Sequence, residues 1–334
     1  MFNSTILNIA EKIATYDDWR ISRDQALALI PENPEAAMDL ISCANKIRQW
    51  FHQQQIFKCG IINAKSGRCP EDCAFCAQSA HHRSNIAEYA LRDVDVLVQA
   101  GLRLAAGGAN NYSMVTSGTA LDDADIDTVC RATEVLRAKS NLKVCASLGM
   151  LTDRSARKLK SAGVTRYHHN LETARSYFPQ ICTTHDYEED IQTLQTARDA
   201  GLELCSGGIF GLGESWEQRV EMAFSLKELD VDAIPINFLN PIEGTALAQR
   251  PLLPPLEALA CIALYRFIHP RKEITVCGGR EVTLRDFQSW VFFAGANGLM
   301  VGNYLTTRGR DIEMDVEMIA QMGLNDDPPK KITD

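Results

Sequence analysis

The chain lacks the features that would direct it to nucleic acid, to a membrane or to export. It has no excess of positive charge, since 34 Lys and Arg stand against 43 Asp and Glu and give a net charge of −9, so no nucleic-acid surface is predicted. No segment approaches the roughly 18 uninterrupted apolar residues of a membrane span. The first 19 residues contain no basic stretch followed by an apolar run, so no secretion signal is predicted. We therefore expect a cytoplasmic protein with neither nucleic acid nor membrane as a partner.

Cysteine, by contrast, is plentiful, with 11 in 334 residues. In a reducing compartment, spaced cysteines bind metal more often than they pair as disulfides. Three of them, Cys69, Cys73 and Cys76, lie close together, and the next one follows far downstream. A cubane needs one ligand per iron, so this C-x3-C-x2-C loop would leave one iron open to a small molecule. The alternative is a structural zinc loop, for which His81 and His82 are the nearby candidates for a fourth ligand.

The spacing of this loop, with Phe75 directly before the last cysteine, is similar to the signature of radical S-adenosylmethionine (SAM) enzymes. This resemblance implies that the loop holds a [4Fe-4S] cluster whose open iron binds SAM. It also implies the reductive splitting of SAM into methionine and a 5′-deoxyadenosyl radical.

Alternating strands and helices predict the fold. Residues 1–50 have apolar residues at helical spacing, and they are predicted to form an N-terminal helical extension. The rest predicts an α/β protein, a (β/α)8 TIM-type barrel over residues 51–324, followed by a flexible tail at 325–334. The cysteine loop follows the first strand and would lie at the C-terminal rim, where barrel enzymes carry their chemistry. The eight predicted strands lie near residues 57–63, 112–116, 143–148, 164–170, 202–208, 232–238, 273–277 and 298–301.

Glycines are predicted to end three of the helices. Gly101, Gly163 and Gly201 each follow an amphipathic segment and precede a strand-like run. The glycine-rich segment 207–213 follows the fifth strand, where it is either a ligand-binding loop or an ordinary tight turn.

Polar residues close the fourth and sixth predicted strands. Alternation along a strand places His168 and Asn170 on one face. Glu172, two residues further on, is expected on the same face. Asn237 brings a further amide to the same rim from the sixth strand. These groups suit a polar ligand. The alternative is that they are ordinary capping residues at a strand end, whose hydrogen bonds are satisfied within the protein. The adjacent pair His168 and His169 faces opposite sides, which does not favour a metal site.

Four further cysteines lie on alternate predicted strands. Cys59, Cys145, Cys205 and Cys277 belong to the first, third, fifth and seventh. Alternate strands of such a barrel contribute the side chains of one interior layer. Four thiols in one layer could hold a second cluster, and four ordinary buried cysteines are the alternative.

From about Cys59 to Leu324 the chain resembles the biotin synthase family. The resemblance implies a homodimeric barrel enzyme that inserts sulfur between the C6 and C9 carbons of dethiobiotin, using two SAM molecules. A second iron–sulfur cluster, usually [2Fe-2S], would supply the sulfur, and an electron donor such as flavodoxin or ferredoxin would reduce the enzyme. The motifs that carry the resemblance lie at residues 63–79, 167–173, 205–214, 235–237, 279–281 and 293–297.

The resemblance also implies roles for particular residues. The SAM [4Fe-4S] cluster would be held by Cys69, Cys73 and Cys76. Phe75 would lie near the adenine, and Asn170 and Glu172 would contact the SAM ribose or the substrate. Asn237 would hold the ureido ring of dethiobiotin. Two ligands of the sulfur-donor cluster would be Cys145 and Cys205.

The chain departs from the family at three positions. Ser113 stands where the family has a third donor-cluster cysteine, and Thr275 stands at the position of an arginine. Cys59 and Cys277 could replace these ligands, and four thiolates would suit a four-iron auxiliary cluster. His185 replaces an arginine that faces the SAM carboxylate, so a bidentate clamp is lost.

The sequence is also compatible with two other functions. The missing ligands favour a related radical SAM enzyme of the hydrogenase-maturase type, whereas the motifs on the fourth and sixth strands favour dethiobiotin. A non-enzymatic iron–sulfur scaffold or carrier is the second rival. SAM binding would separate it from the enzymes, because a carrier needs no SAM pocket.

Overall fold

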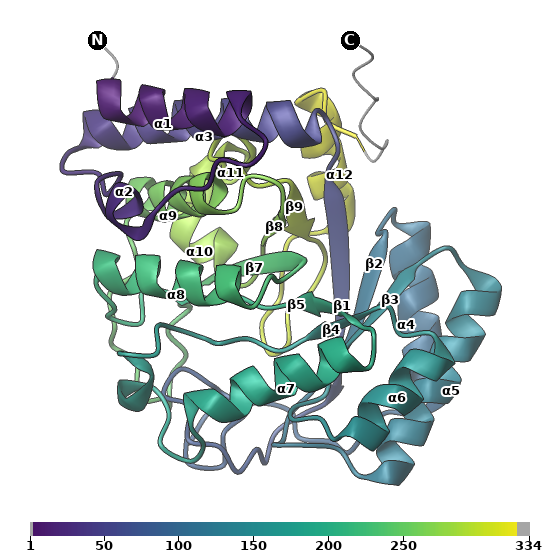
Figure 1. Cartoon of the computed structure of the whole chain (residues 1–334). Helices are drawn as coiled ribbons and strands as arrows, with labels where there is room; N and C mark the ends of the chain where they lie inside the picture. The colour runs from purple at the N-terminus through teal and green to yellow at the C-terminus, as the bar shows by residue number, and fades with distance from the viewer. Residues whose placement is uncertain (1–2, 326–334) are drawn as a thin grey trace.

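Parallel strands close into a barrel in the computed structural model, which describes residues 3–325 (Figure 1). The sheet order is β5-β4-β3-β2-β1-β9-β8-β7-β6, and a pairing of β5 with β7 closes the ring. β6 continues β5 after a break at two residues, so the nine labelled strands occupy eight positions. The predicted (β/α)8 barrel is therefore confirmed. The strands are β1 Phe57–Lys65, β2 Asn111–Thr116, β3 Lys143–Ser147, β4 Arg166–His168, β5 Glu203–Cys205, β6 Gly208–Phe210, β7 Ala233–Phe238, β8 Glu273–Val276 and β9 Gly298–Met300.

Helices alternate with the strands and surround the barrel (Figure 1). Three of them precede β1, and α3 packs against α9. Within residues 3–325, no helix is both long enough and apolar enough to cross a bilayer. The predicted tail at 325–334 lies outside the described residues except for Asn325. The helices are α1 Ser4–Thr15, α2 Arg23–Leu27, α3 Pro34–His52, α4 Val94–Ala106, α5 Asp123–Lys139, α6 Asp153–Ala162, η1 Phe178–Gln180, α7 Tyr187–Asp199, α8 Trp216–Glu228, α9 Pro255–Ile268, α10 Arg280–Leu284, η2 Arg285–Phe287, α11 Trp290–Phe293 and α12 Ile312–Gln321.

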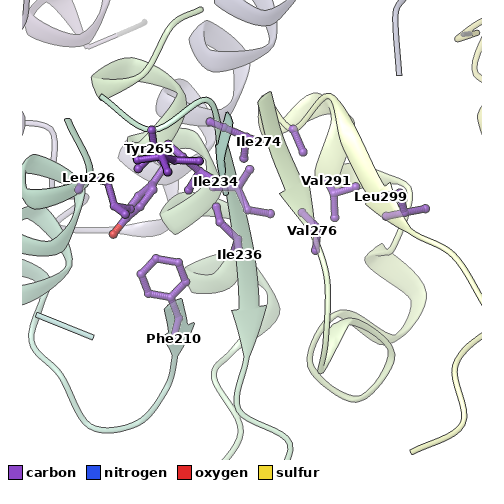
Figure 2. Packing of buried hydrophobic residues seen from close by; sticks show 14 of the residues in the cluster. Phe210, Leu226, Ile234, Ile236, Tyr265, Ile274, Val276, Val291 and Leu299 are labelled. Atoms are coloured by element: carbon purple, nitrogen blue, oxygen red, sulfur yellow. The ribbon is translucent and has the colours of Figure 1, made fainter. Parts of the chain in front are cut away.

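Strand parity separates the outer core from the barrel interior. Ile234 and Ile236 of β7 lie with Ile274 and Val276 of β8 in the buried layer that includes Tyr265 of α9 (Figure 2). Successive side chains of a strand point to opposite faces. The odd-numbered residues of β7 and β8 therefore face the barrel interior, away from the helices.

One predicted helix end is wrong. α4 continues through Gly101 to residue 106, because this glycine serves packing: a Cβ there would lie 2.7 Å from Leu136 Cδ2 and 3.1 Å from Tyr112 Cε1. Glycine therefore permits the close approach of α4 to α5 and β2. The other two ends are confirmed, since Gly163 follows α6 with φ 101° and Gly201 lies beyond α7 with φ 81°.

Two buried histidines remain uncharged in the fold. Burial lowers the pKa of His52 to about 2, and Arg266 lowers it further. The two side chains are in contact, with His52 Nε2 2.9 Å from Arg266 Nη1. Burial likewise lowers the pKa of His269 to about 3, and its Nε2 lies 3.0 Å from the Ala223 carbonyl oxygen.

We expect these histidines to make the fold sensitive to acid. The unfolded chain binds their protons below about pH 6.5 and the folded chain does not, so the free energy of unfolding falls as the pH drops below that value. Between pH 7 and pH 5 the loss should be about 2 kcal/mol for each histidine. Urea unfolding of the cluster-free protein at both pH values measures it. Between these pH values, the free energy of unfolding of His269→Gln should fall by about 2 kcal/mol less than that of the wild type. The free energy of unfolding of the exposed variant His81→Gln should fall by as much as that of the wild type. Equal losses in His269→Gln and the wild type would contradict a neutral buried His269.

Candidate functional site

The cysteine loop folds back on itself beyond the end of β1. It begins at Gly67, whose φ of 79° is left-handed and suits glycine. The amide of Cys69 donates to the Gln78 carbonyl at 3.0 Å, and the amide of Cys76 donates to the Cys73 carbonyl at 2.9 Å. Backbone hydrogen bonds thus position all three cysteines at the C-terminal end of the barrel.

The sulfur atoms of this loop are not arranged as a zinc site. Two thiolates on one tetrahedral zinc ion would lie roughly 3.8 Å apart. Within residues 3–325, a single group of three or more His, Cys, Asp and Glu side chains has ligand atoms that all lie within 4.8 Å of one another. The three loop cysteines do not form such a group. His81 Nε2 instead lies 2.9 Å from the Pro70 carbonyl oxygen, and His82 Nδ1 lies 2.9 Å from that of Cys76. The wider spacing suits three corners of a cubane.

A chain of polar side chains runs from β3 across the end of β4. His168 lies 3.0 Å from both Ser147 Oγ and Asn170 Oδ1, and the Asn170 amide donates to Glu172 at 3.2 Å. The predicted common face is therefore present, and His169 points away from it toward α7. Burial raises the pKa of Glu172 to about 8. The three side chains meet beside the cysteine loop, where a polar ligand could contact them.

Asn237 and Phe75 also lie at this end of the barrel. The Asn237 amide nitrogen donates to the Gly208 carbonyl at 3.3 Å, and its oxygen accepts from the Gly278 amide at 2.9 Å. One N–H and one lone pair remain available for a ligand. Phe75 is half-buried against a small apolar cluster formed by Ile181, Leu212 and Leu239.

The four strand cysteines lie together in the barrel interior. Burial raises the pKa of each thiol, to about 11 for Cys145. Neighbouring thiols raise these pKa values further. The pKa of Cys59 is raised by Cys145 and Cys205. The pKa of Cys277 is raised by Cys59, and that of Cys205 by Cys277. Each sulfur therefore lies within electrostatic range of at least two of the others. They are not all within 4.8 Å, so their spacing suits a cluster better than a single ion. Because β8 ends at residue 276, Cys277 lies beyond the strand and not within it.

Two of the three positions that depart from the family, Ser113 and Thr275, also face this interior. Ser113 pairs in register with Cys145, and its buried Oγ has no hydrogen-bond partner. An orphaned hydroxyl beside buried thiols fits a group bound among them. Thr275 donates to Glu273 Oε1 at 3.3 Å.

Arg166 is an interior residue that the sequence analysis missed. It pairs in register with Cys145, and its guanidinium lies 3.0 Å from carboxylate oxygens of both Glu273 and Glu203. Arg166 and Glu273 are both buried. An arginine on the inward face of a strand is the signal that could have revealed it, because an unpaired charge is rarely buried.

His185 lies against acidic and thiol groups. Its Nδ1 is 2.8 Å from Glu71 Oε2 and 3.3 Å from Cys182 Sγ, and its Nε2 is 3.6 Å from Asp190 Oδ1. Asp190, then Cys182 and Glu71, raise the pKa of His185 to about 11. Cys182 was missed by the sequence analysis. Its spacing to the histidine, Cys-x2-His, is the signal that could have revealed it. The Cys182 sulfur lies 3.8 Å from that of Cys73.

The barrel and its cysteine loop define a radical SAM protein. Residues 64–226 match the family described as Radical SAM superfamily, and residues 235–325 match the Biotin and Thiamin Synthesis associated domain. The chain belongs to the biotin synthase family. The biotin synthase of Syntrophus aciditrophicus is 58% identical over 324 residues, which covers 97% of this chain and 99% of that protein. That of Geobacter metallireducens is 50% identical over 323 residues, covering 96% and 98%.

Solved structures agree on the fold. Methylornithine synthase superposes with a TM-score of 0.82 at 19% identity, covering 96% of this chain and 97% of that one. The FeFe-hydrogenase maturase HydG from Carboxydothermus hydrogenoformans gives a TM-score of 0.79 at 16% identity, covering 96% and 78%. At such low identity these likenesses concern the fold alone. The much higher sequence identity to biotin synthases decides against the hydrogenase-maturase alternative and the carrier.

Proposed function

We propose that this chain converts dethiobiotin to biotin by inserting sulfur between C6 and C9, with SAM as the radical source. The observation that carries this proposal is that one barrel holds two separate sets of thiols. Three lie on the loop at the C-terminal rim, and four lie in the interior. Radical generation and sulfur donation need separate metal groups, and the two sets would supply the ligands for both.

At the rim, Cys69, Cys73 and Cys76 would hold the SAM cluster. Bound there, a [4Fe-4S] group supplies the electron that splits SAM into methionine and a 5′-deoxyadenosyl radical. Asn170 and Glu172 are assigned to hydroxyl groups of the SAM ribose or to the substrate. Their mutual hydrogen bond at 3.2 Å fixes both side chains before the ligand arrives.

Substrate and adenine contacts are assigned to the remaining rim residues. Phe75 would present its half-buried ring to the adenine. Asn237 would use its free N–H and lone pair on the ureido ring of dethiobiotin. Its other amide groups are held by the backbone, so its orientation is fixed. This matched donor and acceptor suit a cyclic urea, which presents both N–H and C=O groups.

In the interior, Cys59, Cys145, Cys205 and Cys277 are proposed as the auxiliary-cluster ligands. Four thiolates suit a four-iron cluster. A [2Fe-2S] cluster, the type usual in the family, is the alternative composition. The orphaned Ser113 hydroxyl would face this group.

The wider setting of the enzyme follows from the same assignment. A reductant such as flavodoxin or ferredoxin would deliver electrons, and the chain would act as a homodimer. All 11 cysteines are free thiols, as a metal-binding protein of the cytoplasm requires.

An anaerobic assay tests the proposed function. The reconstituted protein is incubated with SAM, a reductant and dethiobiotin, and both biotin and 5′-deoxyadenosine are measured. Both products should form. 5′-Deoxyadenosine without biotin would mean that another molecule is the substrate, and the absence of both products would contradict the proposed function.

We expect His185→Ala to weaken SAM binding by about 10- to 150-fold, since a hydrogen bond to a charged group contributes roughly 1.5–3 kcal/mol. The proposed role is a contact to the SAM carboxylate, direct or through water, by an imidazole held between Glu71 and Asp190. Equilibrium binding of SAM to the reconstituted variant measures the effect. Cys130→Ala is the control, because it changes a half-buried side chain on the outer helix α5. An unchanged dissociation constant in His185→Ala would remove this residue from the SAM site.

A further inference from the structure

Glu71, Cys182 and His185 form a compact group beside the cysteine loop. One ligand atom from each lies within 4.8 Å of the other two, and no second group of His, Cys, Asp and Glu within residues 3–325 is so closely arranged. The sulfur of Cys182 lies 3.3 Å from His185 Nδ1, which lies 2.8 Å from Glu71 Oε2. Thiolate, imidazole and carboxylate together are typical ligands of Zn²⁺ and of other divalent transition metals.

Cys73 is the candidate for the fourth ligand of this group. Its sulfur is 3.8 Å from that of Cys182. This is roughly the separation of two thiolates on one tetrahedral ion with metal–sulfur bonds of about 2.3 Å. Cys73 lies outside the group of three, so its side chain would have to turn toward Glu71 to complete a tetrahedral site with two sulfurs, one nitrogen and one oxygen.

Neighbouring residues hold the three ligands in place. Glu71 accepts hydrogen bonds from the Thr119 and Thr184 hydroxyls, one on each carboxylate oxygen. Asp190 is buried and faces the second ring nitrogen of His185 at 3.6 Å. A carboxylate behind a histidine is a common outer support of metal sites, because it orients the ring and makes it a better ligand.

We propose that Glu71, Cys182 and His185, with Cys73 as the fourth ligand, bind one divalent ion in the cluster-free chain and serve as its iron-loading site. Fe²⁺ held there already contacts one of the three loop cysteines. Assembly of the SAM cluster would then begin from a bound ion, and Cys73 would pass with it into the cluster. Binding of this first ion requires no electron transfer, because the ion keeps its oxidation state and the ligands lose only protons, including that of the His185 imidazolium.

The loading role rests on the proposed assignment of Cys73 to the SAM cluster, whereas the binding of the ion does not. Co²⁺ is a suitable probe, because its thiolate complexes absorb light strongly. The full-length cluster-free protein is titrated anaerobically with Co²⁺. The variants Cys182→Ser, His185→Ala and Glu71→Gln should each bind one equivalent less than the wild type. Asp190→Asn should keep the site with an affinity about 10- to 100-fold lower.

Cys130→Ala is the matched control, since this half-buried cysteine lies on the outer helix α5 and should leave the stoichiometry unchanged. Loss of the ion in Cys182→Ser alone would overturn the proposal, because it would indicate a site made only of the loop cysteines and Cys182. Equal stoichiometry in all variants would overturn it as well. Circular dichroism confirms that each variant is folded.

A second measurement tests the loading role. One equivalent of Zn²⁺ bound beforehand should slow the formation of the SAM cluster from a mixture of Fe²⁺, Fe³⁺ and sulfide in the wild type, and much less so in Cys182→Ser. Equal slowing in both proteins would overturn the loading role. If Cys73→Ala still cleaved SAM, the cluster assignment would fail, while the Co²⁺ result would stand by itself.

Discussion

Replacing Cys69, Cys73 or Cys76 by alanine is expected to abolish the formation of 5′-deoxyadenosine. These three thiols are the complete set of ligands that the loop offers. A cubane that binds SAM at its fourth iron therefore has no spare ligand. Losing one ligand should destroy the cluster or change the iron to which SAM binds.

The measurement is the rate of 5′-deoxyadenosine formation by each anaerobically reconstituted variant in the presence of SAM and a reductant. Cys130→Ala is the control and should cleave SAM at the wild-type rate, because it removes a thiol from the outside of the barrel. Near-native SAM cleavage by any single loop variant would mean that the cluster has been assigned to the wrong cysteines.

The reconstituted wild type is expected to hold about eight irons per chain, as two four-iron clusters require. The reason is the set of four interior thiols, Cys59, Cys145, Cys205 and Cys277, which influence one another's pKa. Replacing any one of them by alanine should preserve SAM cleavage and stop biotin formation. On the proposed assignment, sulfur donation depends on the interior set, while radical generation depends on the loop.

Iron analysis, the two product assays and Mössbauer spectra of Cys69→Ala provide the measurement, since that variant isolates the interior cluster. Cys277 is the most informative position, because it lies beyond the end of β8 whereas Thr275 lies within it. A two-iron signature, or full biotin formation by Cys277→Ala, would contradict the four-cysteine set. Neither result would affect membership in the biotin synthase family.

Features that depend on short spacing along the chain could be predicted from the sequence. The loop cysteines lie within one turn-rich segment, so their spacing alone indicated a common metal. The sequence placed His168, Asn170 and Glu172 on one face, and they form a hydrogen-bonded chain although β4 ends at His168. The segment 207–213 shows the limit of this reasoning. A Cβ on Gly207 would lie 2.0 Å from the Pro235 carbonyl oxygen, so this glycine serves close strand packing, which its neighbours in sequence do not reveal.

By itself, the sequence determined the barrel, the position of the cysteine loop and the presence of thiols on the first, third and fifth barrel strands. Each of these follows from periodicity or from spacing within one element. Only the tertiary structure decided which distant groups meet. Cys73 and Cys182 are 109 residues apart, and Arg166 and Glu273 are 107 apart, yet each pair is in contact. Closure of the barrel brings such residues together, and contacts across a closed sheet depend on register and strand tilt, which no local pattern encodes.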